Sequence, residues 1–111
     1  MPDDRSPDGG PTTHAVLDRR LRIAEQVLWR RIGTEVLILD LDSEEYFGLD
    51  GVGGRFWMLI AAGEEPKDAI SRLMDHYEVE FEVIAADLAS LAEALVDRRL
   101  LAVADGQEGA G

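Results

Sequence analysis

The apolar residues of this chain change their spacing once, near residue 50, and this change constrains the fold more than any other feature. Before that point they recur mainly at every second position or in a short unbroken run, which is typical of β-strands. After it they recur at spacings of three and four, which is typical of amphipathic helices. A chain with its strands first and its helices last is expected to fold as an α+β domain.

Three strands are expected in the first half. Ile23, Val27 and Trp29 alternate with polar residues and predict a half-buried strand, although Glu25 interrupts the pattern. The run at 36–41 (VLILDL) suits a central strand, and the segment at 45–49 (EYFGL) follows a plausible turn. Together they predict a three-stranded antiparallel meander in which several apolar side chains share one face with Trp29. These side chains are Leu37, Leu39, Leu41, Phe47 and Leu49.

Three helices are expected in the second half. Asp50 can N-cap the first helix, Gly63 stands where its C-terminal cap belongs, and Pro66 suits the first position of the second helix. The third helix is expected over about residues 82–99. The segment at 77–83 alternates like a strand, so a short fourth strand remains an alternative to a connector. The apolar stripes of the three helices are Val52, Phe56, Leu59 and Ile60; Ile70, Leu73, Met74 and Tyr77; and Ile84, Leu88, Leu91 and Leu95.

The two ends of the chain differ in composition from its middle. Residues 1–20 and 104–111 are rich in proline, glycine and polar or charged side chains, which predicts flexible tails around one folded unit at 21–103. The N-terminus does not resemble a signal peptide, and no apolar run reaches 18 residues. A cytoplasmic location without a membrane partner is therefore expected.

The composition also excludes several classes of function. The chain has no cysteine, and His14 and His76 are too few for a metal site or a convincing catalytic triad, so no metal, cofactor or catalytic residue is expected. Acidic residues outnumber basic ones by 23 to 11, for a net charge of −12, which disfavours nucleic acid. Gly51–Gly54 (GVGG) lacks the spacing of a phosphate-binding loop and better suits a tight turn from strand into helix.

Two features suggest a binding surface. The last strand of the meander is expected at an edge of the sheet, where unpaired backbone groups can accept an added strand. The third helix carries apolar residues around most of its circumference, more than packing on one side requires. If the two lie side by side, they form a groove for an extended peptide. The alternative is that alanine is present only as a good helix former.

The ordered succession of these segments resembles the PqqD-like family. The resemblance covers about residues 22–103 and rests on VLWRRIG at 27–33, EVLILDL at 35–41, EYFGL at 45–49 and VGGRFWMLI at 52–60. In the second half it rests on Ile70, Leu73, Tyr77, Val79, Asp87, Leu88, Leu91, Leu95, Leu100 and Leu101. It implies a winged-helix-like α+β domain with a three-stranded antiparallel sheet followed by three helices.

The resemblance further implies a non-catalytic peptide-recognition element. Such proteins bind the leader region of a ribosomally synthesised precursor peptide as an added strand beside strand three, and deliver it to a leader peptidase or another modifying enzyme. Within the family, the chain is most similar to the stand-alone chaperones of lasso-peptide pathways. Asp87 is expected either to pair with a basic or hydroxyl-bearing leader residue or to face solvent. The implied peptide-binding residues are Tyr46, Phe47, Gly48, Leu49, Ile84, Asp87, Leu88, Leu91 and Leu95.

Two other functions remain open at the level of sequence. A winged-helix domain can act as a DNA-binding regulator, but its recognition helix needs basic residues near its start. The third helix here has Glu82 and Asp87 near its start and only Arg98 and Arg99 at its far end. An assembly or protein-docking module would use the same strand edge to pair with another protein.

Overall fold

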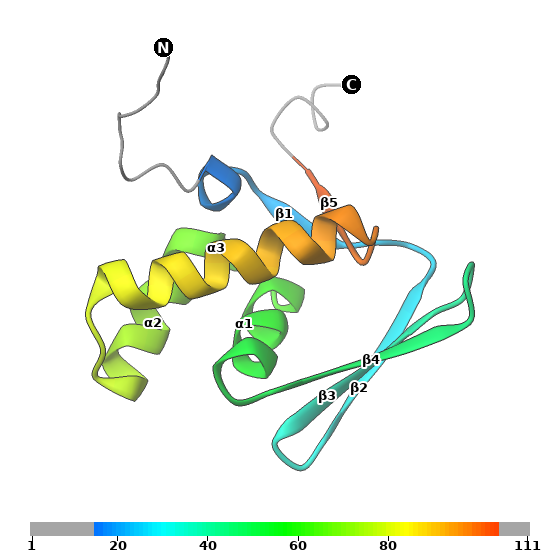
Figure 1. Ribbon diagram of the computed structural model, residues 1–111, viewed down its shortest axis with the longest axis horizontal. Coiled ribbons are helices and arrows are strands. Elements are labelled where there is room, and N and C mark those ends of the chain that lie inside the picture. Colours follow the sequence, from blue (N-terminus) through cyan, green and yellow to red (C-terminus); the bar gives the residue numbers. More distant parts are fainter. Residues whose placement is uncertain (1–14, 105–111) are drawn as a thin grey trace.

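The computed structural model describes residues 15–104 and confirms the expected α+β class, with a three-stranded antiparallel sheet followed by three helices (Figure 1). A short 3₁₀ helix and a separate two-stranded sheet complete the described part. The elements are η2 (Ala15–Asp18), β1 (Leu21–Ile23), β2 (Val27–Ile32), β3 (Glu35–Asp40), β4 (Glu45–Asp50), α1 (Gly51–Ala61), α2 (Pro66–Tyr77), α3 (Phe81–Asp97) and β5 (Leu101–Val103).

The register of the larger sheet decides which side chains face the helices. The strand order is β2-β3-β4, and Trp29 lies opposite Ile38, which lies opposite Phe47. Directly paired residues share a face, so Trp29, Ile38 and Phe47 lie on the inner face, where Val36 and Ile38 are fully buried. Leu37 and Leu39 lie on the outer face instead. The prediction that Leu37, Leu39 and Leu41 share a face with Trp29, Phe47 and Leu49 is therefore wrong.

The first predicted strand is two strands in two different sheets. β1 ends at Ile23, the N–H of Val27 donates to the carbonyl of Ala24 in a turn, and β2 begins at Val27. β1 pairs with β5, with Ile23 opposite Leu101. Glu25, which interrupts the alternation in the sequence, lies in this break. Three-residue strands are too short for a periodic signal, which explains why the sequence pattern missed β5.

The helix boundaries agree closely with the sequence. Gly63 has a φ of 99° and donates its N–H to the carbonyl of Ile60, as expected of the residue that caps α1. Pro66 opens α2. Asp50 occupies the N-cap position of α1, but its side chain makes no capping hydrogen bond. Between α2 and α3 lies a short connector with Glu78 in the left-handed conformation, so the alternative of a strand at 77–83 is wrong.

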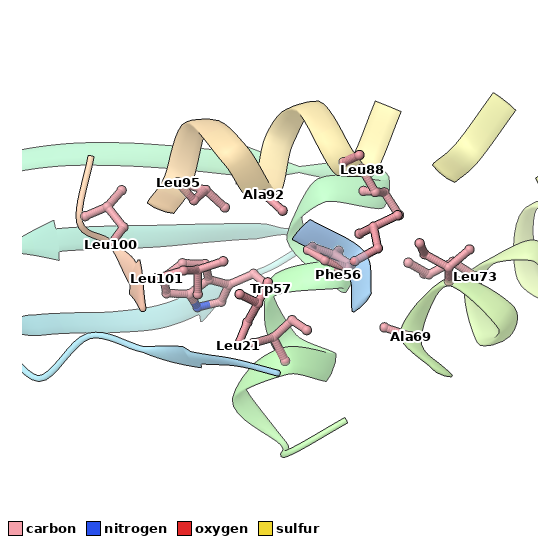
Figure 2. Close-up of a cluster of buried hydrophobic side chains, with 14 of the residues drawn as sticks. Leu21, Phe56, Trp57, Ala69, Leu73, Leu88, Ala92, Leu95, Leu100 and Leu101 are labelled. Atoms are coloured by element: carbon pink, nitrogen blue, oxygen red, sulfur yellow. The ribbon is translucent and has the colours of Figure 1, made fainter. Parts of the chain in front are cut away.

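The core is organised around α1. This helix contacts α2, α3, β1, β3 and β4, and its Phe56 and Trp57 are fully buried. Figure 2 shows Trp57 gathered with Leu21 of β1 and Leu101 of β5. The ring of Trp29 meets that of Trp57 edge to face, with 6.3 Å between their centroids. The two sheets therefore converge on one side of α1.

The folded unit begins before residue 21. Leu17 of η2 is buried in the core, and the Nζ atom of Lys67 in α2 lies 2.7 Å from the Oδ1 atom of Asp18. The hydrogen bond and the charge of Asp18 raise the pKa of Lys67. Residues 15–20 thus differ from the expected flexible tail at 1–20. The remainder of that tail, and the expected tail at 104–111 apart from Ala104, lie outside the described residues.

Candidate functional site

One of the two edges of the larger sheet is formed by β4, and the other by β2. Within residues 15–104, β3 is the only neighbouring strand of β4. In an antiparallel sheet, every second residue of an edge strand directs its N–H and C=O away from its neighbour. The six residues of β4 thus present an extended backbone of about 20 Å that can accept another strand.

The turn before β4 holds its start in place. Asp40 is buried, and its Oδ1 atom accepts a hydrogen bond of 3.0 Å from the N–H of Asp42. Its Oδ2 atom accepts a second bond of 3.0 Å from the hydroxyl of Ser43, whose oxygen in turn accepts a hydrogen bond from the N–H of Glu45. Both carboxylate oxygens of Asp40 are therefore used to shape the turn.

Glycines hold the other end of β4 close to α1. Gly51 has a φ of 56°, which allows the sharp turn from strand into helix. A Cβ atom on Gly54 would lie 3.2 Å from the carbonyl oxygen of Leu49, a tight contact, so glycine favours this close approach of helix and strand. The glycine run thus has the packing role that the sequence suggested.

The side chains of β4 alternate between the two faces of the sheet. Phe47 and Leu49 are half-buried on the inner face, whereas Tyr46 and Gly48 lie on the outer face. The structure therefore does not bring the side chain of Tyr46 together with α3. Tyr46 and Gly48 take part in the proposed strand edge only through their backbone.

The residues predicted on α3 fall into two groups. Ile84, Leu88 and Leu95 are buried in the core, where they can support a peptide site only from beneath. Asp87 is exposed and Leu91 is half-buried, so both are accessible to a partner. The apolar residues expected around most of the helix lie mainly on its core face, where Ala85, Ala89 and Ala92 are buried as well. The exposed surface is mostly polar, with Val83, Ala86 and Ala94 among the exposed residues.

A further residue beside β4 was not predicted. The guanidinium carbon of Arg98, at the C-terminal end of α3, lies 5.2 Å from the centroid of the Phe47 ring. This is a cation–π contact, and it links the end of α3 to the edge strand. Arg98 follows Leu91 by seven residues, so the two side chains lie on one face of the helix. This spacing is the sequence signal that could have identified Arg98.

The outer face of the sheet is a second notable surface. Leu28 is 57% exposed and Tyr46 66%, and no described element covers them. A hollow of about 400 Å³ lies on this face. It is lined by Leu28, Trp29, Arg30, Leu37, Leu39 and Tyr46. Large apolar side chains gathered on an open surface are typical of a protein contact.

The described part of the chain lacks the features of two other kinds of site. Among residues 15–104, no group of three or more His, Asp or Glu side chains is placed to hold a metal ion. None of the helices described is long and apolar enough to cross a membrane.

Comparisons with known proteins agree with this geometry. Residues 35–101 match the family model described as coenzyme PQQ synthesis protein D (PqqD). Among solved structures, the chain is similar to "TbiB1 in Complex with the TbiA(beta) Leader Peptide", with 34% identity and a TM-score of 0.70 over 72% of this chain and 93% of that one.

A second solved structure supports the fold alone. It is "Lasso peptide synthetase B1 complexed with the leader peptide", with 23% identity and a TM-score of 0.68 over 75% of this chain and 98% of that one. No curated protein matches the chain in sequence.

Proposed function

Because the chain belongs to the PqqD family, we propose that it binds the leader region of a ribosomally synthesised precursor peptide and delivers it to processing enzymes. The open edge of β4, with Phe47 and Leu49 on its inner face, is the observation that carries this proposal. An added strand would pair with the free backbone groups of β4. Its alternate side chains would then pack beside Phe47 and Leu49 and against the accessible face of α3.

The positions of the residues support a separate role for each in the proposed site. Phe47 and Leu49 provide apolar contacts on the strand, and Leu91 and Asp87 provide contacts on the helix. The backbone of Tyr46 and Gly48 pairs with the leader, and Ile84, Leu88 and Leu95 support α3 from the core. A lasso-peptide precursor is the favoured class, since both similar structures contain a leader peptide and one of the two proteins is a lasso peptide synthetase B1.

We propose no catalytic step for this chain. An extended peptide held by backbone pairing and apolar contacts gains affinity and a defined position, and the described part of the site offers no nucleophile with an adjacent base. Chemistry on the precursor then belongs to a separate partner enzyme.

A direct titration tests the binding role. A fluorescently labelled copy of the leader peptide encoded beside this gene is titrated with the protein, and fluorescence anisotropy is recorded. Saturable binding is expected, while a scrambled peptide of the same composition is expected to remain free. If the folded protein binds neither peptide, or both equally, the proposal of leader recognition is wrong.

Delivery of the leader requires a second surface, and the outer face of the sheet fits this role. It lies on the opposite side of β4 from Phe47, so a bound leader leaves it open. A leader added to β4 would also extend this face by one strand. We therefore propose that the enzyme that removes the leader docks on Leu28, Leu37 and Tyr46.

A charge placed on this face should separate delivery from binding. Leu28→Asp is expected to keep leader affinity within about twofold but to slow leader removal by the partner peptidase about tenfold or more, because a carboxylate would be buried in an apolar contact. Leader affinity by anisotropy and cleavage by mass spectrometry measure the two effects. Ala86→Asp introduces the same charge at an exposed residue on another face of α3 and should alter neither. Unchanged cleavage by the Leu28 variant would rule out this docking face.

A further inference from the structure

One stripe on the accessible face of α3 carries opposite charges at its two ends. Asp87, Leu91, Ala94 and Arg98 are spaced by four, three and four residues, so they lie on one face of the helix. The acidic end and the basic end are separated by about 16 Å, at 1.5 Å per helical residue. Between them the stripe is apolar.

This stripe borders the strand edge, and its direction relative to β4 is defined by two contacts. A Cβ atom on Gly53, just beyond the C-terminal end of β4, would lie 3.2 Å from the Cδ2 atom of Leu91. Arg98 lies over Phe47, farther back in the strand. Moving forward along α3 therefore means moving backward along β4, as the ribbon in Figure 1 also shows.

Both charges are available to a ligand. Within residues 15–104, neither Asp87 nor Arg98 forms an ion pair or a side-chain hydrogen bond. Glu45 lies on the same face of β4 as Phe47, but it does not pair with Arg98. Among the described residues, the guanidinium contacts the Phe47 ring and no carboxylate, so its N–H donors can bind a carboxylate of the leader.

From this arrangement, and resting on the proposed function, we infer that the protein selects leaders with a specific order of charge. A leader that adds antiparallel to β4, the more stable pairing, runs in the same direction as α3. Its N-terminal part then meets Asp87 and its C-terminal part meets Arg98. The preferred leader carries a Lys or Arg about four or six residues before an Asp or Glu, since a strand rises about 3.3 Å per residue and only residues an even number apart share a face. Asp87 and Arg98 thus determine both the register and the direction of the bound peptide.

Charge reversal tests this inference with the native leader and a leader of exchanged charges. Arg98→Glu and Asp87→Lys are each expected to weaken binding of the native leader about tenfold, because each replaces an attraction by a repulsion. A leader with its matching basic and acidic residues exchanged should bind the wild-type protein poorly and should be rescued by the Asp87→Lys, Arg98→Glu double variant. Raising the salt concentration should weaken the wild-type complex more than that of Arg98→Ala.

Matched controls make the same charge changes at sites off the stripe. Arg99→Glu alters the neighbouring residue, whose side chain lines a different hollow near β5, and Glu93→Lys alters another face of α3. Both are expected to bind the native leader normally. If the wild-type protein binds the leader but all four single charge reversals change its affinity equally, or none changes it, the charge inference is wrong and leader recognition stands. If the wild-type protein does not bind the leader, the proposed function itself fails.

Discussion

Replacing Trp57 by alanine is expected to unfold the domain or to lower its free energy of unfolding by about 3–5 kcal/mol, as for other large-to-small aromatic substitutions in cores. Trp57 is fully buried where α1, β1 and β5 meet (Figure 2). A domain of this size has a total stability of only about 5–10 kcal/mol, so the loss removes a large part of it. Urea denaturation followed by circular dichroism measures the change.

Two further substitutions show whether packing at Trp57 is the cause. Trp29→Ala removes the ring that meets Trp57 edge to face. Because Trp29 is 37% exposed, this substitution should lower the free energy of unfolding much less than Trp57→Ala does. Trp57→Phe keeps a buried aromatic ring and removes the indole N–H, which has no acceptor among the described residues, so most of the stability should remain. A Trp57→Ala variant as stable as the wild type would show that the indole is not a core residue.

Phe47→Asp is expected to weaken leader binding by about thirtyfold or more while the domain remains folded. Phe47 is only half-buried, and it lies on the inner face of the edge strand beneath Arg98. A carboxylate at this position removes the apolar contact in the centre of the proposed site, which corresponds to about 2 kcal/mol or more, a loss in affinity of roughly thirtyfold. Fluorescence anisotropy with the labelled leader measures the affinity, and circular dichroism checks the fold.

The adjacent residue provides the control for this prediction. Tyr46→Asp makes the same change on the same strand, but its side chain points to the opposite face. Leader affinity should therefore be nearly unchanged, although docking of the partner enzyme should suffer. If the Phe47 variant loses its fold, Phe47 belongs to the core; if it folds and binds normally, the leader does not contact the inner face of β4.

Local patterns in the sequence explain how much of the architecture could be predicted. The spacing of apolar residues and the caps at Gly63 and Pro66 depend on neighbours within a few positions, so the three helices and the meander followed from them. The open edge at β4 followed from its place as the last strand. The short strands β1 and β5 did not, because each spans only three residues and forms through a pairing across the whole domain.

Local sequence patterns could not predict which face of the sheet is buried. Every position from Val36 to Leu39 is apolar, so alternation in the sequence cannot tell which side chains of β3 are buried. The pairing register decides this, because it places Ile38 opposite Trp29 and Phe47. The same holds for α3, where an apolar side chain such as Leu88 or Leu91 becomes core or surface only once α1 and α2 have packed against the helix.

The order of amino acids was enough to predict the element types, their succession and the family, because these depend on local spacing and on ordered motifs along the chain. Three-dimensional packing was needed to select which side of the sheet faces solvent, to place Ile84, Leu88 and Leu95 in the core, and to bring Arg98 over Phe47. The physical reason is separation along the chain. Phe47 and Arg98 are brought together by the packing of α1 between strand and helix, and no local pattern records that contact.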